Sequence, residues 1–90
     1  MDADRITKKI AEFASSPKNV RFDEIETLLE NHIQHLFAGR YNHRNPGGSH
    51  HAFTVGDQTF TIPKPTSGCV KEVYVKKFIR AMEELGLYEG

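Results

Sequence analysis

Cysteine, net charge and long apolar runs are all scarce in this sequence, and each shortage excludes a class of protein. Cys69 is the one cysteine among 90 residues, so the chain can form no internal disulfide and has no paired-cysteine zinc motif. Nowhere do about 18 apolar residues follow one another, as a membrane-spanning helix would need. The N-terminus is charged throughout and lacks the apolar stretch of a signal peptide. We therefore expect a cytoplasmic protein that is neither secreted nor inserted in a membrane.

The chain carries no net charge, because 12 basic residues balance 12 acidic ones. This balance argues against a protein that holds nucleic acid by its overall charge, since phosphate binding normally depends on an excess of Lys and Arg. The charges are nevertheless unevenly distributed: residues 38–80 contain seven bases and two acids, whereas residues 1–37 have a net charge of −2. The basic middle can face a polyanion or can simply be a solvated surface.

An amphipathic helix is predicted over residues 4–14. Its apolar positions, spaced by three or four residues, are Ile6, Ile10 and Phe13. Asp2 or Asp4 can serve as the N-cap, because a carboxylate accepts hydrogen bonds from the first free backbone amides. Proline restricts the residue before it, so the segment 15–19, which contains Pro17, is expected to break the helix.

A second helix is predicted from Phe22 to about His32 or Gln34. Acidic residues in its first turn match the helix dipole. Its apolar stripe consists of Phe22, Ile25, Leu28, Leu29 and Ile33. Residues 35–44 can then supply a first strand before a turn at Asn45–Gly48, although the sequence leaves the register of that strand open.

A β-hairpin is the clearest feature of the middle of the chain. Its arms, residues 49–55 and 58–62, alternate apolar and polar side chains and are joined by the two-residue turn Gly56-Asp57. Side chains two residues apart in a strand share a face. One face of the first arm therefore carries His51, Phe53 and Val55, and the other carries His50, Ala52 and Thr54.

The last helix follows a loop over residues 63–68, and Gly86 is its expected C-terminal cap. Its apolar stripe contains Val75, Phe78, Ile79, Met82 and Leu85. The predicted order is α-α-β-β-β-α, an α+β fold with a three-stranded antiparallel sheet and helices packed on one face. The 90 residues, 38% of them apolar, predict one domain with an additional N-terminal helix in residues 1–16 and a core in residues 20–87.

The segment Gly47-Gly48-Ser49-His50 is the main candidate for chemistry. Its glycines let the backbone approach a ligand closely, and His50 then emerges at the start of a strand. An imidazole titrates near neutral pH, so it can take the proton of a ribose 2′-hydroxyl or give one to the departing 5′-oxygen in RNA cleavage. As a bare pattern, however, paired histidines at a strand start are common as ordinary polar residues.

Several sequence features together resemble one family of known proteins. They are Asn19-Val20-Arg21-Phe22 with Glu24, the pair Leu28-Leu29, Gly48-Ser49-His50-His51 with Phe53, and Val75 with Phe78-Ile79. Over residues 20–87 the chain is similar to the HicA family, the toxin half of HicA–HicB toxin–antitoxin pairs. The resemblance implies a fold like the double-stranded-RNA-binding domain, and metal-independent cleavage of messenger RNA without a cofactor.

The resemblance also assigns roles to individual residues. In the family the histidine directly after Gly-Ser is catalytic, which corresponds to His50, and His51 is then structural. Members usually carry Lys or Arg before Gly-Ser, where this chain has Pro46-Gly47, so other bases are expected to supply the positive charge. The residues expected to bind RNA are Gly48, Ser49, Arg40, Arg44, Lys64 and Lys71.

The partner implied by the resemblance is a HicB-like antitoxin protein that covers His50 and the basic surface. The free toxin is then expected to be a monomer, and a hetero-oligomer with its antitoxin. The second acid/base group of the reaction stays open, with water or a lysine as candidates. Tyr41 and Tyr74 are further candidates for this group, although we expect them to be packing residues.

Two other functions fit the same residues. The first is a non-catalytic RNA- or protein-binding module on the same fold, in which His50 contributes only a hydrogen bond. The second is a metal site built on His32 and His35, which are three apart on a predicted helix and can share a face. Either His43, His50 or His51 would complete that ligand set. Cleavage of RNA in the presence of a chelator, and elemental analysis for zinc, distinguish these functions.

Overall fold

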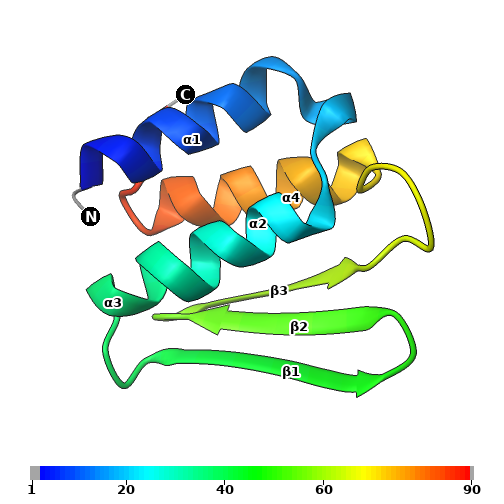
Figure 1. The fold of residues 1–90 in the computed structure, drawn as a ribbon. Coiled ribbons are helices and arrows are strands. Elements are labelled where there is room, and N and C mark those ends of the chain that lie inside the picture. Colours follow the sequence, from blue (N-terminus) through cyan, green and yellow to red (C-terminus); the bar gives the residue numbers. More distant parts are fainter. Residues whose placement is uncertain (1–2, 90) are drawn as a thin grey trace.

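A computed structural model describes residues 3–89, and their elements follow the predicted order (Figure 1). The elements are α1 (Ala3–Ser15), α2 (Phe22–Leu28), α3 (Gln34–Leu36), β1 (Tyr41–Gly47), β2 (His50–Val55), β3 (Gln58–Pro63) and α4 (Glu72–Glu84). The strands form one antiparallel sheet in the order β1-β2-β3, with helices on one face and the other face open (Figure 1). The predicted α+β fold class is confirmed.

Helix α1 exceeds its predicted range by one residue at each end. Asp4 lies in its first turn, while Asp2, the other expected N-cap, lies outside the described residues. The predicted break is present, and Pro17–Asn19 form a short 3₁₀ helix within it. Proline is well suited to the first position of a helix, because it has no amide hydrogen that would lack a partner there.

Helices α2 and α3 belong to one helical segment, joined by a π-helical turn at Leu29–Ile33. The segment therefore ends at Leu36, slightly beyond the predicted end. Leu29 and Ile33 are fully buried, so the wide turn keeps the apolar stripe against the core. Such turns occur frequently at functional sites. This turn contains Glu30, whose carboxylate accepts a hydrogen bond from the hydroxyl of Tyr41 in β1.

Strands β2 and β3 form the predicted hairpin around Gly56-Asp57. Gly56 has a φ of +60°, the left-handed backbone that such a two-residue turn requires. Phe53 is fully buried on the helix-facing side of β2, and the alternation of the strand puts His51 on that side with it. His50 lies on the open side, so the predicted faces of the hairpin are confirmed.

The structure defines the register of β1, which the sequence left open. His43 pairs with Phe53 and therefore lies on the helix-facing side of the sheet. Pairing continues across a bulge to Gly47, so the predicted turn at Asn45–Gly48 is wrong. The turn is Gly48-Ser49, because Gly48 supplies the left-handed φ of +60° that reverses the chain there.

The hydrophobic core lies between the sheet and the helices. Phe60 of β3 packs against two rings, at centroid distances of 5.7 Å from Phe53 and 5.7 Å from Phe78 of α4. The predicted stripe of α4 is confirmed at Val75, Phe78 and Met82, which are fully buried. Burial of one such side chain contributes about 1.5–3 kcal/mol. The helices therefore hold the sheet from one side only.

Helix α1 packs on α4, on the side away from the sheet (Figure 1). The ring of Phe13 meets the ring of Phe78 edge-on at 6.1 Å, and the Thr7 hydroxyl donates to the Leu87 carbonyl at 2.7 Å. Gly86, with a φ of +77°, follows the end of α4 as the predicted cap. Within residues 3–89, every helix is too short or too polar to pass through a lipid bilayer.

Candidate functional site

His50 is the first residue of β2 and lies exposed on the open face of the sheet. It follows the turn Gly48-Ser49, and its neighbours across the strands are Gly47 and Pro63. Neither neighbour carries a long side chain that could cover the imidazole. A ligand can therefore reach the ring from the open face.

The imidazole of His50 has no hydrogen bond, ion pair or ring contact with any other residue in the range 3–89. Both ring nitrogens are thus available to a ligand. In many acid–base sites a further protein group orients the base. Here the described part of the chain supplies none, so a bound substrate would have to orient the ring of His50 itself.

Two of the expected RNA-binding bases lie at the same end of the sheet as His50. Arg44 is exposed on the open face of β1, diagonal to His50. The backbone amide of Lys64 donates to the Ser49 carbonyl at 2.6 Å, which holds Lys64 beside the turn. The ammonium group of Lys64 lies 5.6 Å from the centroid of the Phe22 ring, and therefore extends toward the helical side.

The other two expected bases are placed differently. The carbonyl of Arg40 accepts a hydrogen bond from the Gly56 amide at 2.8 Å, so Arg40 lies at the hairpin-turn end of the sheet. That end is roughly 20 Å from His50, given a rise of about 3.3 Å per strand residue. Lys71 is exposed and immediately precedes α4, beyond the loop that leaves β3 (Figure 1). Around His50 the structure therefore gathers Arg44 and the Lys64 backbone, and not Arg40.

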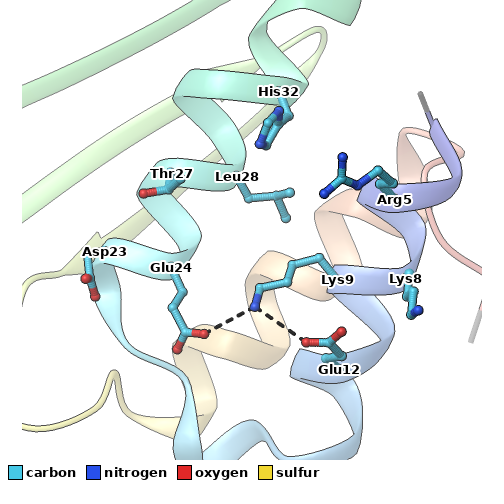
Figure 2. A pocket seen from close by; sticks show the side chains of 9 residues that line it. All are labelled: Arg5, Lys8, Lys9, Glu12, Asp23, Glu24, Thr27, Leu28 and His32. Carbon is cyan, nitrogen blue, oxygen red and sulfur yellow. Dashed lines mark hydrogen bonds and ion pairs between the residues drawn. The ribbon is translucent and has the colours of Figure 1, made fainter. Parts of the chain in front are cut away.

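A pocket of about 530 Å³ lies between α1 and α2 on the helical side of the molecule (Figure 2). Lys9 extends across it, 3.5 Å from the Glu12 carboxylate and 3.4 Å from the Glu24 carboxylate. Exposed ion pairs of this kind contribute at most about 1 kcal/mol. The Lys9–Glu24 pair connects α1 to α2, whereas the Lys9–Glu12 pair lies within α1. The pocket contains none of the residues expected to cleave or bind RNA.

The alternative metal site on His32 and His35 is not assembled in the described residues. His32 lines the pocket between α1 and α2 (Figure 2). His35 is exposed on α3. A different set has the geometry of metal ligands: Glu26 from α2, His43 from β1 and His51 from β2. Their ligand atoms all lie within 4.8 Å of one another, and each residue is half-buried.

Hydrogen bonds connect His43 to Glu30, and Glu30 to Tyr41. We call Glu26, Glu30, Tyr41, His43 and His51 the histidine cluster. His43 Nε2 and His51 Nδ1 are 2.8 Å apart. His43 Nδ1 is 3.3 Å from one Glu30 oxygen, and the Tyr41 hydroxyl donates to the other at 2.5 Å. A carboxylate only accepts, so His43 Nδ1 carries the proton. When His43 is neutral, its Nε2 has the lone pair, and the Nδ1–H of His51 donates to it.

Burial shifts the pKa of two members of the histidine cluster. The pKa of the Tyr41 phenol is raised far above its ordinary value, first by burial and then by its hydrogen bond to the Glu30 carboxylate. The pKa of His51 is lowered from its ordinary value of 6.5, first by burial and then by His43. Both side chains are therefore neutral at pH 7.

The sequence alone does not reveal the histidine cluster as a unit. Two signals for it were present: Glu26 and Glu30 are four residues apart on a predicted helix, and His51 shares a strand face with apolar residues. The missing information was the register of β1. Only the observed pairing of this strand with β2 brings His43 beside His51.

Comparisons with known proteins give no relative: no protein family, curated protein or solved structure matches this chain. The similarity to the HicA family thus depends on sequence features of residues 20–87 alone. Function has to be argued from the site itself, that is, from the exposed His50, its neighbours and the face of the sheet on which they lie.

Proposed function

We propose that this protein is a cytoplasmic toxin of the HicA type, an endoribonuclease that cleaves messenger RNA without a metal ion and uses His50 as its catalytic residue. The observation that carries the proposal is the position of His50. Its imidazole is exposed on an open sheet face beside a glycine turn, and no other described residue engages it.

The chemistry needs one proton acceptor and one proton donor. The ribose 2′-oxygen attacks the adjacent phosphorus while a base takes its proton, and the bond from phosphorus to the 5′-oxygen breaks. The departing 5′-oxygen then takes a proton from an acid. His50 can perform one of these two transfers, and water or a lysine performs the other.

RNA binding in this proposal uses the end of the sheet at which His50 lies. Arg44 shares the open face with His50, and Gly48 and Ser49 form the adjoining turn. Lys64 and Lys71 follow on the loop and at the start of α4, where cationic groups attract phosphates. Arg40, at the far end of the sheet, would contact a more distant part of the RNA.

The proposed partner is a HicB-like antitoxin that covers the open face of the sheet and so blocks His50. Most residues of this face are polar and exposed or half-exposed, Ala52 and Pro63 being apolar, and no helix of the described residues covers it (Figure 1). The free toxin would be a monomer and would form a hetero-oligomer with the antitoxin.

A non-catalytic RNA- or protein-binding module is the second candidate function. The observation that favours it is the lack of a described protein group that orients the imidazole of His50. Such a module would retain RNA through phosphate and 2′-hydroxyl contacts without cutting it.

The test is incubation of the purified protein with a long single-stranded RNA in EDTA. His50→Ala should reduce the cleavage rate by at least about 100-fold, the usual contribution of one acid/base group. His35→Ala, which removes another exposed imidazole, is the matched control and should cleave as the parent does. Circular dichroism verifies that all three proteins are folded. RNA retention without cleavage by the folded parent would replace the enzyme with the binding module.

A further inference from the structure

The histidine cluster has the geometry of a metal site, which RNA cleavage by His50 on the open face does not require. Glu26, His43 and His51 come from three different elements, and their ligand atoms lie within 4.8 Å of one another. At a tetrahedral zinc ion, bonds of about 2.0–2.2 Å hold the ligand atoms about 3.3–3.5 Å apart. The two histidine nitrogens, now 2.8 Å apart, need to separate only slightly for an ion to enter between them.

The remaining members of the cluster orient one of the ligands. Glu30 accepts the Nδ1–H of His43, so the lone pair of neutral His43 is on Nε2, the nitrogen that would bind an ion. The Tyr41 hydroxyl in turn holds the other oxygen of Glu30. A carboxylate behind a ligating histidine is a recurrent feature of zinc sites, because it sets both the tautomer and the direction of the ring.

Aromatic rings enclose the two histidines on the core side. The His43 ring stacks on Phe53 at a centroid distance of 4.3 Å, and the His51 ring lies 4.8 Å from Phe22. The His43 side chain is 17% exposed, and its strand β1 is at the sheet edge. An ion can therefore reach the site from solvent and then bind to rings whose positions are largely determined by packing.

The charges around the cluster also suit a divalent cation. The carboxylates of Glu26 and Glu30 together provide two negative charges, and the two imidazoles can bind in their neutral form. Lys64 is a nearby positive charge that would disfavour a bound cation, and its ammonium group lies over the Phe22 ring. One divalent ion would balance the two carboxylates.

We propose that His43 Nε2, His51 Nδ1 and a carboxylate oxygen of Glu26 bind one zinc-class divalent ion, with water as the fourth ligand. Glu30 is a positioning residue that acts through His43. To bind, neutral His51 moves its proton from Nδ1 to Nε2. The ion would tie the edge strand β1 and strand β2 to α2. The site lies on the helix-facing side of the sheet, so the proposal does not depend on catalysis by His50.

The experiment titrates Zn²⁺ into the full chain after EDTA treatment and removal of the chelator, with isothermal calorimetry as the readout. We expect one ion per chain. His43→Ala and His51→Ala should each weaken binding by more than about 100-fold, since each removes one of three protein ligands. Glu30→Gln should weaken it by about 10–100-fold, the usual effect of losing the carboxylate behind a ligating histidine.

His50→Ala and His35→Ala are the controls, because each removes an exposed imidazole and leaves the cluster intact. Both should bind Zn²⁺ within a factor of two of the parent, a margin far smaller than the effect of losing a ligand. Loss of binding in a control would place the ion on surface histidines and overturn the proposal. A folded parent that binds no Zn²⁺ would overturn it as well.

A second measurement needs no substitution in the cluster and so does not depend on the folding of variants. In the ¹⁵N-histidine spectrum of the parent, Zn²⁺ should shift Nε2 of His43 and Nδ1 of His51 and leave both nitrogens of His50 unchanged. Shifts confined to other histidines would reject the site. RNA cleavage, measured in EDTA, tests the function of His50 separately, so failure of either proposal is distinguishable from failure of the other.

Discussion

Two adjacent histidines of β2 lie in opposite surroundings. The imidazole of His50 is exposed on the open face and makes no hydrogen bond, ion pair or ring contact with another described residue, whereas His51 is half-buried and hydrogen-bonded to His43. The cause is the alternation of a strand, which turns neighbouring side chains to opposite sides of the sheet. The difference shows how one dipeptide can offer a free imidazole to a ligand and a restrained imidazole to the fold.

Loss of the Phe53 ring, on the helix-facing side of the sheet, should have the largest effect on stability. Phe53 is fully buried and stacks on both His43 and Phe60. Phe53→Ala is expected to lower the free energy of unfolding by about 3–5 kcal/mol, through lost burial and the cavity that remains. Urea denaturation measures it. Thr61→Ala, an exposed open-face change, is the control and should cost less than about 0.5 kcal/mol. Similar losses of stability in the two variants would mean that the helix-facing and open sides of the sheet contribute equally to the fold.

The second-largest effect on stability should come from a hydrogen bond on the helix-facing side of the sheet. Tyr41→Phe removes the hydroxyl that donates to the Glu30 carboxylate and keeps the ring. It should lower the free energy of unfolding by about 1–2 kcal/mol, since the bond is charge-assisted but only partly buried. Tyr74→Phe has no such bond to lose among the described residues and should change stability little. Equal stability of the two variants in urea would mean that Glu30 needs no partner.

Acid should lower the free energy of unfolding through His51, on the helix-facing side of the sheet. Burial and His43 lower the pKa of His51, with Lys64 acting in the same direction and Glu26 in the opposite one. In the unfolded chain His51 has its ordinary pKa of 6.5, so below that pH the unfolded state binds more protons than the folded state. The contribution of His51 to the free energy of unfolding is therefore complete above pH 6.5 and is lost as the pH falls. The slope per proton is at most about 1.4 kcal/mol per pH unit. Urea denaturation in EDTA measures it, and His51→Gln should flatten the dependence where His50→Gln should not.

The smallest effect is expected at the turn before His50. Gly48 has a φ of +60°, and a methyl group added there would meet no atom of the described residues within 4 Å, apart from those of its two chain neighbours. Gly48→Ala should therefore cost about 1 kcal/mol, from backbone strain alone. Gly47→Ala, at a glycine without a positive φ, is the matched control. Thermal unfolding compares them. Equal midpoints for the two variants would indicate that the turn tolerates another conformation.

The sequence predicted those parts of the site that depend on local periodicity. The arms of the β2–β3 hairpin alternate regularly around Gly56-Asp57, so the opposite faces of His50 and His51 were predictable. Strand β1 has no such pattern: it includes Pro46 and ends in Gly47, residue types that are rare inside strands. Its pairing, and with it the position of His43, could not be predicted from propensity.

The sequence by itself determined the order of elements, the apolar stripes of the helices and the side of β2 on which each histidine lies. These properties follow from side-chain periods of 3.6 and 2 residues, which are local. The tertiary structure alone decided that Glu26, Glu30, Tyr41, His43 and His51 meet in one cluster, and that Arg40 lies far from His50. Such meetings depend on strand register and helix placement, which are determined by packing between residues distant in the sequence.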